Sequence, residues 1–163
     1  MGHPTIYPTG VTIYNPEKCW NGLTVFQGQE VGAVLMDMNG REHNVWKGVH
    51  GFPNKIFPGG YLVTSRGRRT GKYSVQDQTD VVQLDWDGRE VWKFDRNEYI
   101  EDPGYEPRWM ARYHHDFQRE GSSVGYYAPD TAPKSLEGNT LVLCHKNIRN
   151  KRISDKLLLD DVI

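Results

Sequence analysis

The sequence predicts an all-β fold built from repeated four-stranded antiparallel sheets. The first observation behind this prediction is composition, because 17 Gly, 9 Pro, 5 Trp and 9 Tyr in 163 residues are typical of turn-rich, aromatic-rich β structure. The second is a hairpin signal of the form Asp-x-Asn/Asp-Gly, which occurs twice. The third is an internal repeat, in which Asp37 and Gly40 recur as Asp85 and Gly88 at an offset of 48.

Each copy of the hairpin signal lies between two strand-like runs. An apolar run comes first, over 33–36 in one copy and 81–84 in the other, and a run containing Val-Trp-Lys follows in both. Asn-Gly or Asp-Gly between such runs is the strongest short-range signal for a β-hairpin. The Val-Trp pairs are offset by 46, so we expect the first copy to hold two extra residues, His43 and Asn44, in a bulge or longer turn.

A second strand-forming element follows each hairpin. It is a glycine turn that leads into an alternating apolar strand, at 58–63 in the first unit and 137–143 in the second. Two hairpins give four strands per unit, and four-stranded units recurring at about 40–50 residues are typical of β-propeller blades. We therefore predict that 1–163 is one segment of an incomplete β-propeller, with blades over 31–94 and 80–163 and the start of a third.

Polar segments rich in Pro and Gly interrupt the second unit, over 95–111 and 118–137, and we predict that they are loops. Loops of this length are functional lids or binding loops, or else disordered. The last segment, 155–163, is an apolar strand in which Asp161-Val-Ile matches Asp80-Val-Val and opens a third unit. Because a blade buries its faces only against other blades, we expect this strand to lack sheet partners. Either the sequence is a fragment, or the chain self-associates through open blade edges. Its apolar side chains are Leu157, Leu158, Leu159, Val162 and Ile163.

Charge and segment composition argue against several partners and compartments. The formal net charge is −1, with basic and acidic residues interspersed, so neither nucleic acid nor a membrane surface is expected as a partner. Residues 1–20 lack the basic and apolar regions of a signal peptide, and the sequence as written predicts a cytoplasmic protein. Cys19 and Cys144 are far apart, and their contexts support neither a CxxC motif nor a zinc knuckle.

Histidine placement is the most informative polar feature. His50 and His115 occupy corresponding places in the two units, after the Val-Trp strand and before the glycine-turn strand. In a propeller, that position opens the strand lining the channel, so we expect imidazoles of successive blades to converge there. His114, Arg112 and Arg119 lie close to His115 in the sequence. The alternative is that each histidine only caps or hydrogen-bonds a turn.

Imidazole and guanidinium groups together suit chemistry on anions. Imidazole serves as a nucleophile or proton shuttle near neutral pH, and guanidinium donates to sulfate, phosphate or carboxylate oxygens. We therefore predict that His115 is catalytic and that His50, His114, Arg112 and Arg119 bind the substrate. We expect no metal site, because the adjacent side chains of the His-His-Asp run point to opposite faces of a strand and rarely chelate one ion.

The tryptophans fall into two groups. Trp46 and Trp92 are expected to pack between blades as core. Trp86 lies in a hairpin turn and Trp109 in an insertion, so both are candidates for stacking on an aromatic substrate.

Taken together, these motifs resemble the arylsulfotransferase-like family of bacterial propeller proteins. The resemblance runs over nearly the whole chain and rests on several short motifs that are specific only in combination. They are Gly51-Phe-Pro-Asn, Pro58-Gly-Gly-Tyr-Leu, Leu84-Asp-Trp-Asp-Gly-Arg-Glu-Val-Trp, His114-His-Asp-Phe, Gly138-Asn-Thr-Leu-Val and Asp161-Val-Ile.

The resemblance implies a six-bladed propeller and transfer of a sulfuryl group from an aryl sulfate to another phenol, through a sulfated channel histidine and without a cofactor. It implies that His115 faces the channel with His50 as its repeat counterpart, and that the sulfated histidine lies in a later blade. Well-studied members of the family are exported. Two alternatives stay open, namely a non-catalytic binding or scaffold propeller and a metal- or quinone-dependent propeller oxidoreductase.

Overall fold

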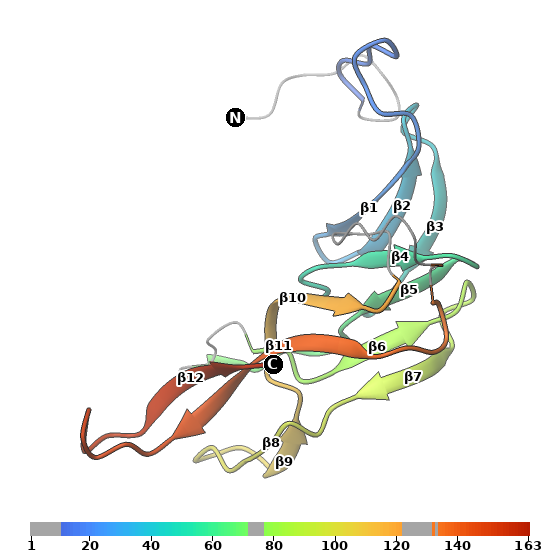
Figure 1. Cartoon of the computed structure of the whole chain (residues 1–163). Helices are drawn as coiled ribbons and strands as arrows, with labels where there is room; N and C mark the ends of the chain where they lie inside the picture. Colours follow the sequence, from blue (N-terminus) through green and yellow to red (C-terminus); the bar gives the residue numbers. More distant parts are fainter. Residues whose placement is uncertain (1–10, 72–76, 122–131, 133) are drawn as a thin grey trace.

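The computed structural model describes residues 11–71, 77–121, 132 and 134–163, and its regular structure is β-sheet (Figure 1). The all-β prediction is therefore confirmed. No helix among the described residues is long and apolar enough to cross a membrane. The strands are β1 (Leu23–Gly28), β2 (Gly32–Asp37), β3 (Glu42–Trp46), β4 (Lys55–Phe57), β5 (Tyr61–Thr64), β6 (Val81–Leu84), β7 (Glu90–Phe94), β8 (Glu98–Ile100), β9 (Arg108–Met110), β10 (Tyr113–Arg119), β11 (Thr140–Ile148) and β12 (Leu158–Val162).

The strands form separate antiparallel sheets in chain order. β1-β2-β3 and β10-β11-β12 are three-stranded sheets, β4-β5-β6-β7 is four-stranded, and β8-β9 is a two-stranded ribbon. None of these sheets closes on itself within the described residues. The sheet boundaries differ from the predicted units, because the break between β3 and β4 falls inside 31–94 and the four-stranded sheet covers 55–94.

The repeated hairpins β2–β3 and β6–β7 have the same geometry. In each, the first Asp of the turn accepts hydrogen bonds from the backbone N–H groups two and four residues later. The turn glycines Gly40 and Gly88 have φ of 79° and 82°, which glycine adopts without steric cost. The predicted two-residue insertion is wrong: Ala33 pairs with Trp46 as Val81 pairs with Phe94, so the offset of 48 holds through both strands.

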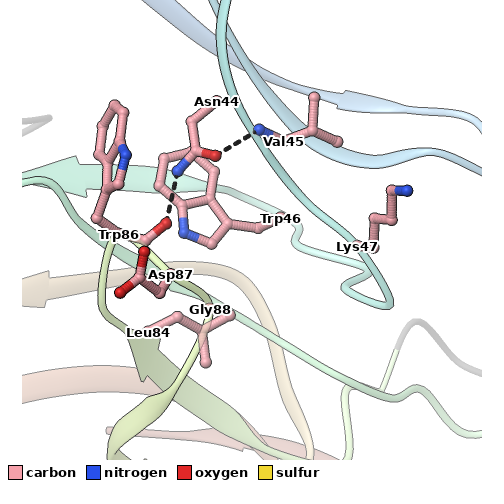
Figure 2. A pocket seen from close by; sticks show the side chains of 8 residues that line it. All are labelled: Asn44, Val45, Trp46, Lys47, Leu84, Trp86, Asp87 and Gly88. Atoms are coloured by element: carbon pink, nitrogen blue, oxygen red, sulfur yellow. Dashed lines mark hydrogen bonds between the residues drawn. The ribbon is translucent and has the colours of Figure 1, made fainter.

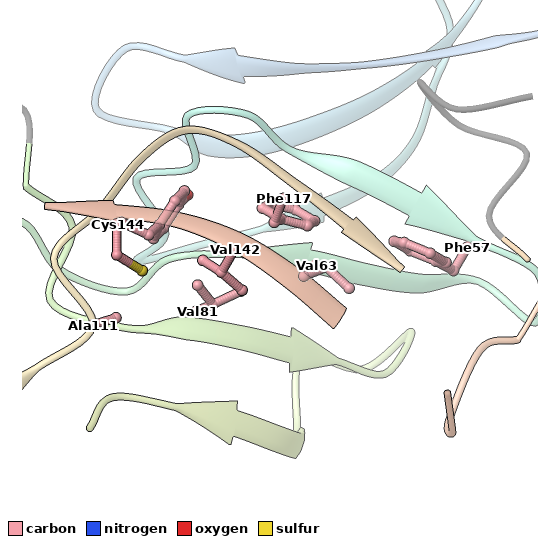
Figure 3. Close-up of a cluster of buried hydrophobic side chains, with 8 residues drawn as sticks. Phe57, Val63, Val81, Ala111, Phe117, Val142 and Cys144 are labelled. Atoms are coloured by element: carbon pink, nitrogen blue, oxygen red, sulfur yellow. The ribbon is translucent and has the colours of Figure 1, made fainter. Parts of the chain in front are cut away.

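The sheets stack face to face, and β6 is buried on both faces. Val82 and Leu84 pack against Ala33, Leu35 and Trp46 of the first sheet. Val81 packs on the other side against the third sheet, and Figure 3 shows this second cluster between β4–β6 and β10–β11. Strands covered on both faces are rich in apolar residues, and in β6 only the buried Gln83 interrupts the apolar run. The second cluster comprises Phe57, Val63, Val81, Ala111, Tyr113, Phe117, Val142 and Cys144.

The core positions of two tryptophans and the state of the cysteines follow from this stacking. Trp46 is buried and its indole N–H donates to the carbonyl oxygen of Asp85 at 2.8 Å, as predicted for a residue between sheets. Trp92 is half-buried against the second cluster. Cys19 and Cys144 are both free, and Cys144 is buried.

Two predictions about the second unit need correction. The segment 95–111 is not only a loop, because it contains the ribbon β8–β9, in which Tyr99 faces Trp109. Much of the other insertion, 118–137, lies outside the described residues. The final strand has a sheet partner, since β12 pairs with β11 as the third strand of its sheet. The match of Asp161 to Asp80 thus marks the third strand of two sheets and not the start of a new one.

Candidate functional site

Asp77 is the centre of a buried network of charged side chains. It lies before β6, and its carboxylate is fully buried. Its Oδ2 accepts hydrogen bonds from Arg112 Nε at 2.9 Å and from Arg69 Nη1 at 3.1 Å. Its Oδ1 lies 2.5 Å from Nδ1 of His145 in β11. Such partners are required at this depth, because a buried and unpaired charge is strongly destabilising.

Both guanidinium groups of this network also bind a second carboxylate. Arg112 donates from Nη1 to Glu98 in β8, and Arg69 donates from Nε to Asp102 at 2.7 Å. The side chain of Arg112 is only 1% exposed. The substrate-binding role predicted for Arg112 therefore requires that one of these carboxylates be exchanged for the substrate.

Two imidazoles and a carboxylate lie together at the edge of the network. The rings of His114 in β10 and His145 in β11 stack with centroids 3.7 Å apart and planes 19° apart. Asp161 in β12 approaches both rings, with its Oδ1 3.1 Å from His114 Nε2 and 3.7 Å from His145 Nε2. Strand register explains the arrangement, because His145 and Asp161 are directly opposite each other in the β11–β12 pair.

The two imidazoles differ in the partners of their Nδ1 atoms. Nδ1 of His145 faces the Asp77 carboxylate, while its Nε2 faces Asp161. Burial, followed by the positive charge that His145 can carry, lowers the pKa of His114. His114 Nδ1 is buried and has no hydrogen-bond partner among the described residues. The pair has the chemistry of bases, nucleophiles or metal ligands.

His115, the predicted catalytic residue, lies beside this pair, where the register of β10 is irregular between Tyr113 and Phe117. It is exposed, whereas His114 is 4% exposed. Its ring lies 5.1 Å from the His114 ring and 5.6 Å from the Phe52 ring, and within the described ranges its nitrogens make no hydrogen bond. Its φ of 59° is in the left-handed region, which is unfavourable for a residue with a side chain.

The other two predicted residues make their contacts elsewhere. His50 is exposed ahead of β4, and its backbone N–H donates to the carbonyl oxygen of Ser65 at 2.7 Å. Arg119 lies at the far end of β10 from Arg112 and is 4% exposed. Burial lowers the pKa of its guanidinium. Its hydrogen-bond acceptors are Gln83, the Ser135 carbonyl and Thr140, and it lies over the rings of Trp92 and Phe57.

Three residues of this network were not assigned a role from the sequence. His145 was only one of six histidines, and Asp161 was noted only as a repeat match. Asp77 carries no motif, and 68 residues separate it from His145. The one available signal was the repeat itself, because the match of 161–163 to 80–82 places Asp161 at the same sheet position as Asp80.

A separate surface hollow of about 410 Å³ lies between the hairpins β2–β3 and β6–β7. Figure 2 shows its indoles, Trp46 and Trp86, beside Asn44, whose amide donates to the Trp86 carbonyl oxygen at 2.7 Å. The two rings are edge to face, with centroids 5.7 Å apart, and Trp86 is 46% exposed. Trp109 is equally exposed but packs on Tyr99. None of the imidazoles described above lines this hollow.

Comparisons with models of protein families, with curated proteins and with solved structures found no match to this chain.

Proposed function

We propose that this protein transfers a sulfuryl group from an aryl sulfate to a second phenol through a histidine, on a β-propeller scaffold. Face-to-face stacking of antiparallel sheets and the 48-residue hairpin repeat support the scaffold part of the proposal. Neither feature depends on the sheets closing into a ring.

The single observation that carries the catalytic part is the state of His115. Its imidazole is exposed, its nitrogens are unengaged by the described residues, and its backbone is held in an unfavourable conformation. Backbone strain of this kind concentrates at functional sites, where the surrounding structure maintains it. We therefore assign the attack to His115 and not to a histidine of a later unit.

The reaction proceeds in two displacements. A lone pair on a His115 nitrogen attacks sulfur, the N–S bond forms, and the S–O bond to the aryl group breaks as the phenolate leaves and takes up a proton. The oxygen of the second phenol then attacks the same sulfur, the N–S bond breaks, and the phenolic proton is released. His114 packs edge-on against the reacting ring and orients it.

An assay with a chromogenic nitrophenyl sulfate and a second phenol tests the proposal. We expect turnover by the wild type and a loss of at least about 10²-fold in His115→Asn. His43→Asn is the matched control, because His43 is also an exposed strand histidine and contacts only Asp37 among the described residues. A rate unchanged in His115→Asn removes the site assignment, and no turnover by the wild type favours a non-catalytic propeller.

A further inference from the structure

The network around Asp77 contains more carboxylates than guanidiniums. Two guanidiniums, Arg69 and Arg112, form salt bridges with three carboxylates, and a fourth carboxylate, Asp161, lies against His114 and His145. The carboxylates therefore outnumber the guanidiniums by two in a partly buried environment, where charges interact more strongly than in water. The carboxylates are Asp77, Glu98, Asp102 and Asp161.

The edge of this network has the composition and spacing of a metal site. We propose that His114, His145 and Asp161 bind a first-row divalent transition metal ion, with Zn²⁺ as the representative. One ligand atom from each residue lies within 4.8 Å of the others. Nitrogen and oxygen ligands at about 2.0–2.1 Å in a tetrahedron are about 3.4 Å apart. The distances of 3.1 and 3.7 Å from Asp161 Oδ1 to the two Nε2 atoms bracket that value.

The residues behind the ligands have the features of a supported metal site. Metal-binding histidines commonly donate their other ring N–H to a carboxylate, which fixes the tautomer and the ring. His145 has this arrangement, since its Nδ1 faces Asp77 while Nε2 faces Asp161. Asp77 is itself fixed by Arg69 and Arg112, so His145 is already oriented, whereas His114 Nδ1 has no hydrogen-bond partner among the described residues.

Comparison with the repeat shows that an Asp at the position of Asp161 can be hydrogen-bonded within its sheet without histidine partners. Its counterpart in the four-stranded sheet is Asp80, which accepts hydrogen bonds from Ser65 Oγ and from the Arg66 backbone N–H, both at 2.8 Å. Among the residues that the structure describes, no histidine bonds to Asp80. The stacked imidazoles are therefore specific to the third sheet, and a structural repeat position does not account for them.

This inference goes beyond the proposed function and does not depend on it. The two are compatible, because the His115 ring lies 5.1 Å from the His114 ring and a cation at the site adds positive charge near an anionic ester. Arg112 does not supply that charge freely, because two carboxylates already bind it.

Zinc titration of the purified protein, followed with a competing chromogenic chelator, tests the site directly. We expect one ion per chain, and Asp161→Asn should weaken binding by at least about tenfold. This variant should fold, because the Asp161 side chain is 62% exposed. Asp37→Asn is the matched control, since Asp37 forms an exposed His–Asp pair with His43 at 3.0 Å that has no third ligand.

Thermal unfolding gives a second readout that needs no substrate. Zinc should raise the melting temperature of the wild type and of Asp37→Asn, and raise it less in Asp161→Asn, because only binding to the folded state stabilises. Equal affinity in wild type and Asp161→Asn, or no stoichiometric binding, overturns the proposal. If sulfuryl transfer persists in the presence of the chelator, the reaction does not need the metal ion. The zinc titration then decides the metal site by itself, so failure of the metal site and failure of the proposed function can be told apart.

Discussion

The carboxylate of Asp77 links residues that are far apart in the chain. It holds two arginines and one histidine, and these belong to the loop after β5, to the segment before β10 and to β11. Hydrogen bonds to charged groups are strong when water is excluded. Their net contribution to folding stability, however, depends on every group in the network keeping a hydrogen-bond partner. The effect of removing one member is therefore much larger than that of breaking a surface pair.

Asp77→Asn tests this directly. The substitution keeps the shape of the side chain but replaces one carboxylate oxygen by an NH2 group, so buried donors of Arg69 and Arg112, or of His145, lose their acceptor. We expect the free energy of unfolding, measured by urea titration, to fall by about 1–3 kcal/mol.

The control is Asp87→Asn, because Asp87 pairs with Arg89 at 3.1 Å on the surface and is 63% exposed. The free energy of unfolding of Asp87→Asn should lie within about 0.5 kcal/mol of the wild-type value. Similar losses in both variants would show that Asp77 does not have the central role described here.

At the scale of elements, the repeated hairpins determine local geometry through their turns. The Asp side chain of each turn bonds two backbone N–H groups, and the glycine three residues after it takes the positive φ. The Asp and the Gly that meet these two requirements lie within four consecutive residues, so the hairpins could be predicted from the sequence.

Gly88→Ala isolates the backbone part of this requirement. A Cβ at Gly88 meets no atom closer than 3.9 Å, so the cost comes only from the φ of 82°. We expect a loss of about 1–2 kcal/mol in the free energy of unfolding. Gly22→Ala is the matched control, because a Cβ there has open space and Gly22 has no positive φ. The free energy of unfolding of this variant should stay unchanged or rise slightly. Equal effects would contradict the turn argument.

The fold class was more predictable than the site. Hairpins and stacked apolar strands follow from local sequence patterns. The site depends instead on the register of β11 against β12, which brings His145 opposite Asp161. That register depends on a connection whose length the sequence pattern did not specify. His114 is buried and His115 is exposed, but the irregular register of β10 leaves their rings 5.1 Å apart, so simple strand alternation does not describe the two residues. The alternation argument concerned only a metal site made by neighbours, and it gave no information on ligands from three different strands.

Lys55 and Asp116 connect β4 to β10 across two sheets, with 2.5 Å between Nζ and Oδ1. Burial raises the pKa of Asp116, but hydrogen bonds from Lys55 and Gln118 outweigh burial and hold it below its ordinary value. Because the folded pKa is the lower one, this carboxylate stabilises the protein above the unfolded pKa of about 3.9, and the effect is lost as the pH falls through the folded value.

Asp116→Asn should therefore lower the free energy of unfolding by about 1 kcal/mol at pH 6, a small value because the Asp116 side chain is 48% exposed. The difference from the wild type should shrink as the pH falls below about 4. Urea titrations at several pH values measure it. A difference that is constant over this range would show that the charge of Asp116 is not responsible.

At the scale of the whole molecule, the central sheet is covered on both faces and the outer two are not. Phe26 of β1 pairs with Val34, faces away from the stack and is 40% exposed. In the third sheet, Leu141, Leu159 and Ile163 are 62%, 46% and 84% exposed. Exposed apolar surface of this kind on a sheet face favours association, and each of these side chains gains about 1.5–3 kcal/mol when fully buried.

We therefore expect copies of the chain to associate head to tail, with the Phe26 face of one against the Leu159 face of the next. Such a contact uses two different surfaces, so it builds rings or open stacks and depends on concentration.

Sedimentation velocity should show species larger than a monomer at high concentration. Leu159→Lys should shift the distribution to monomer, because a charge would be buried in the contact. Ile153→Lys is the control, since Ile153 is 71% exposed outside the strands and should leave the distribution unchanged. A monomer at every concentration, or equal effects of the two lysines, would contradict association through these faces.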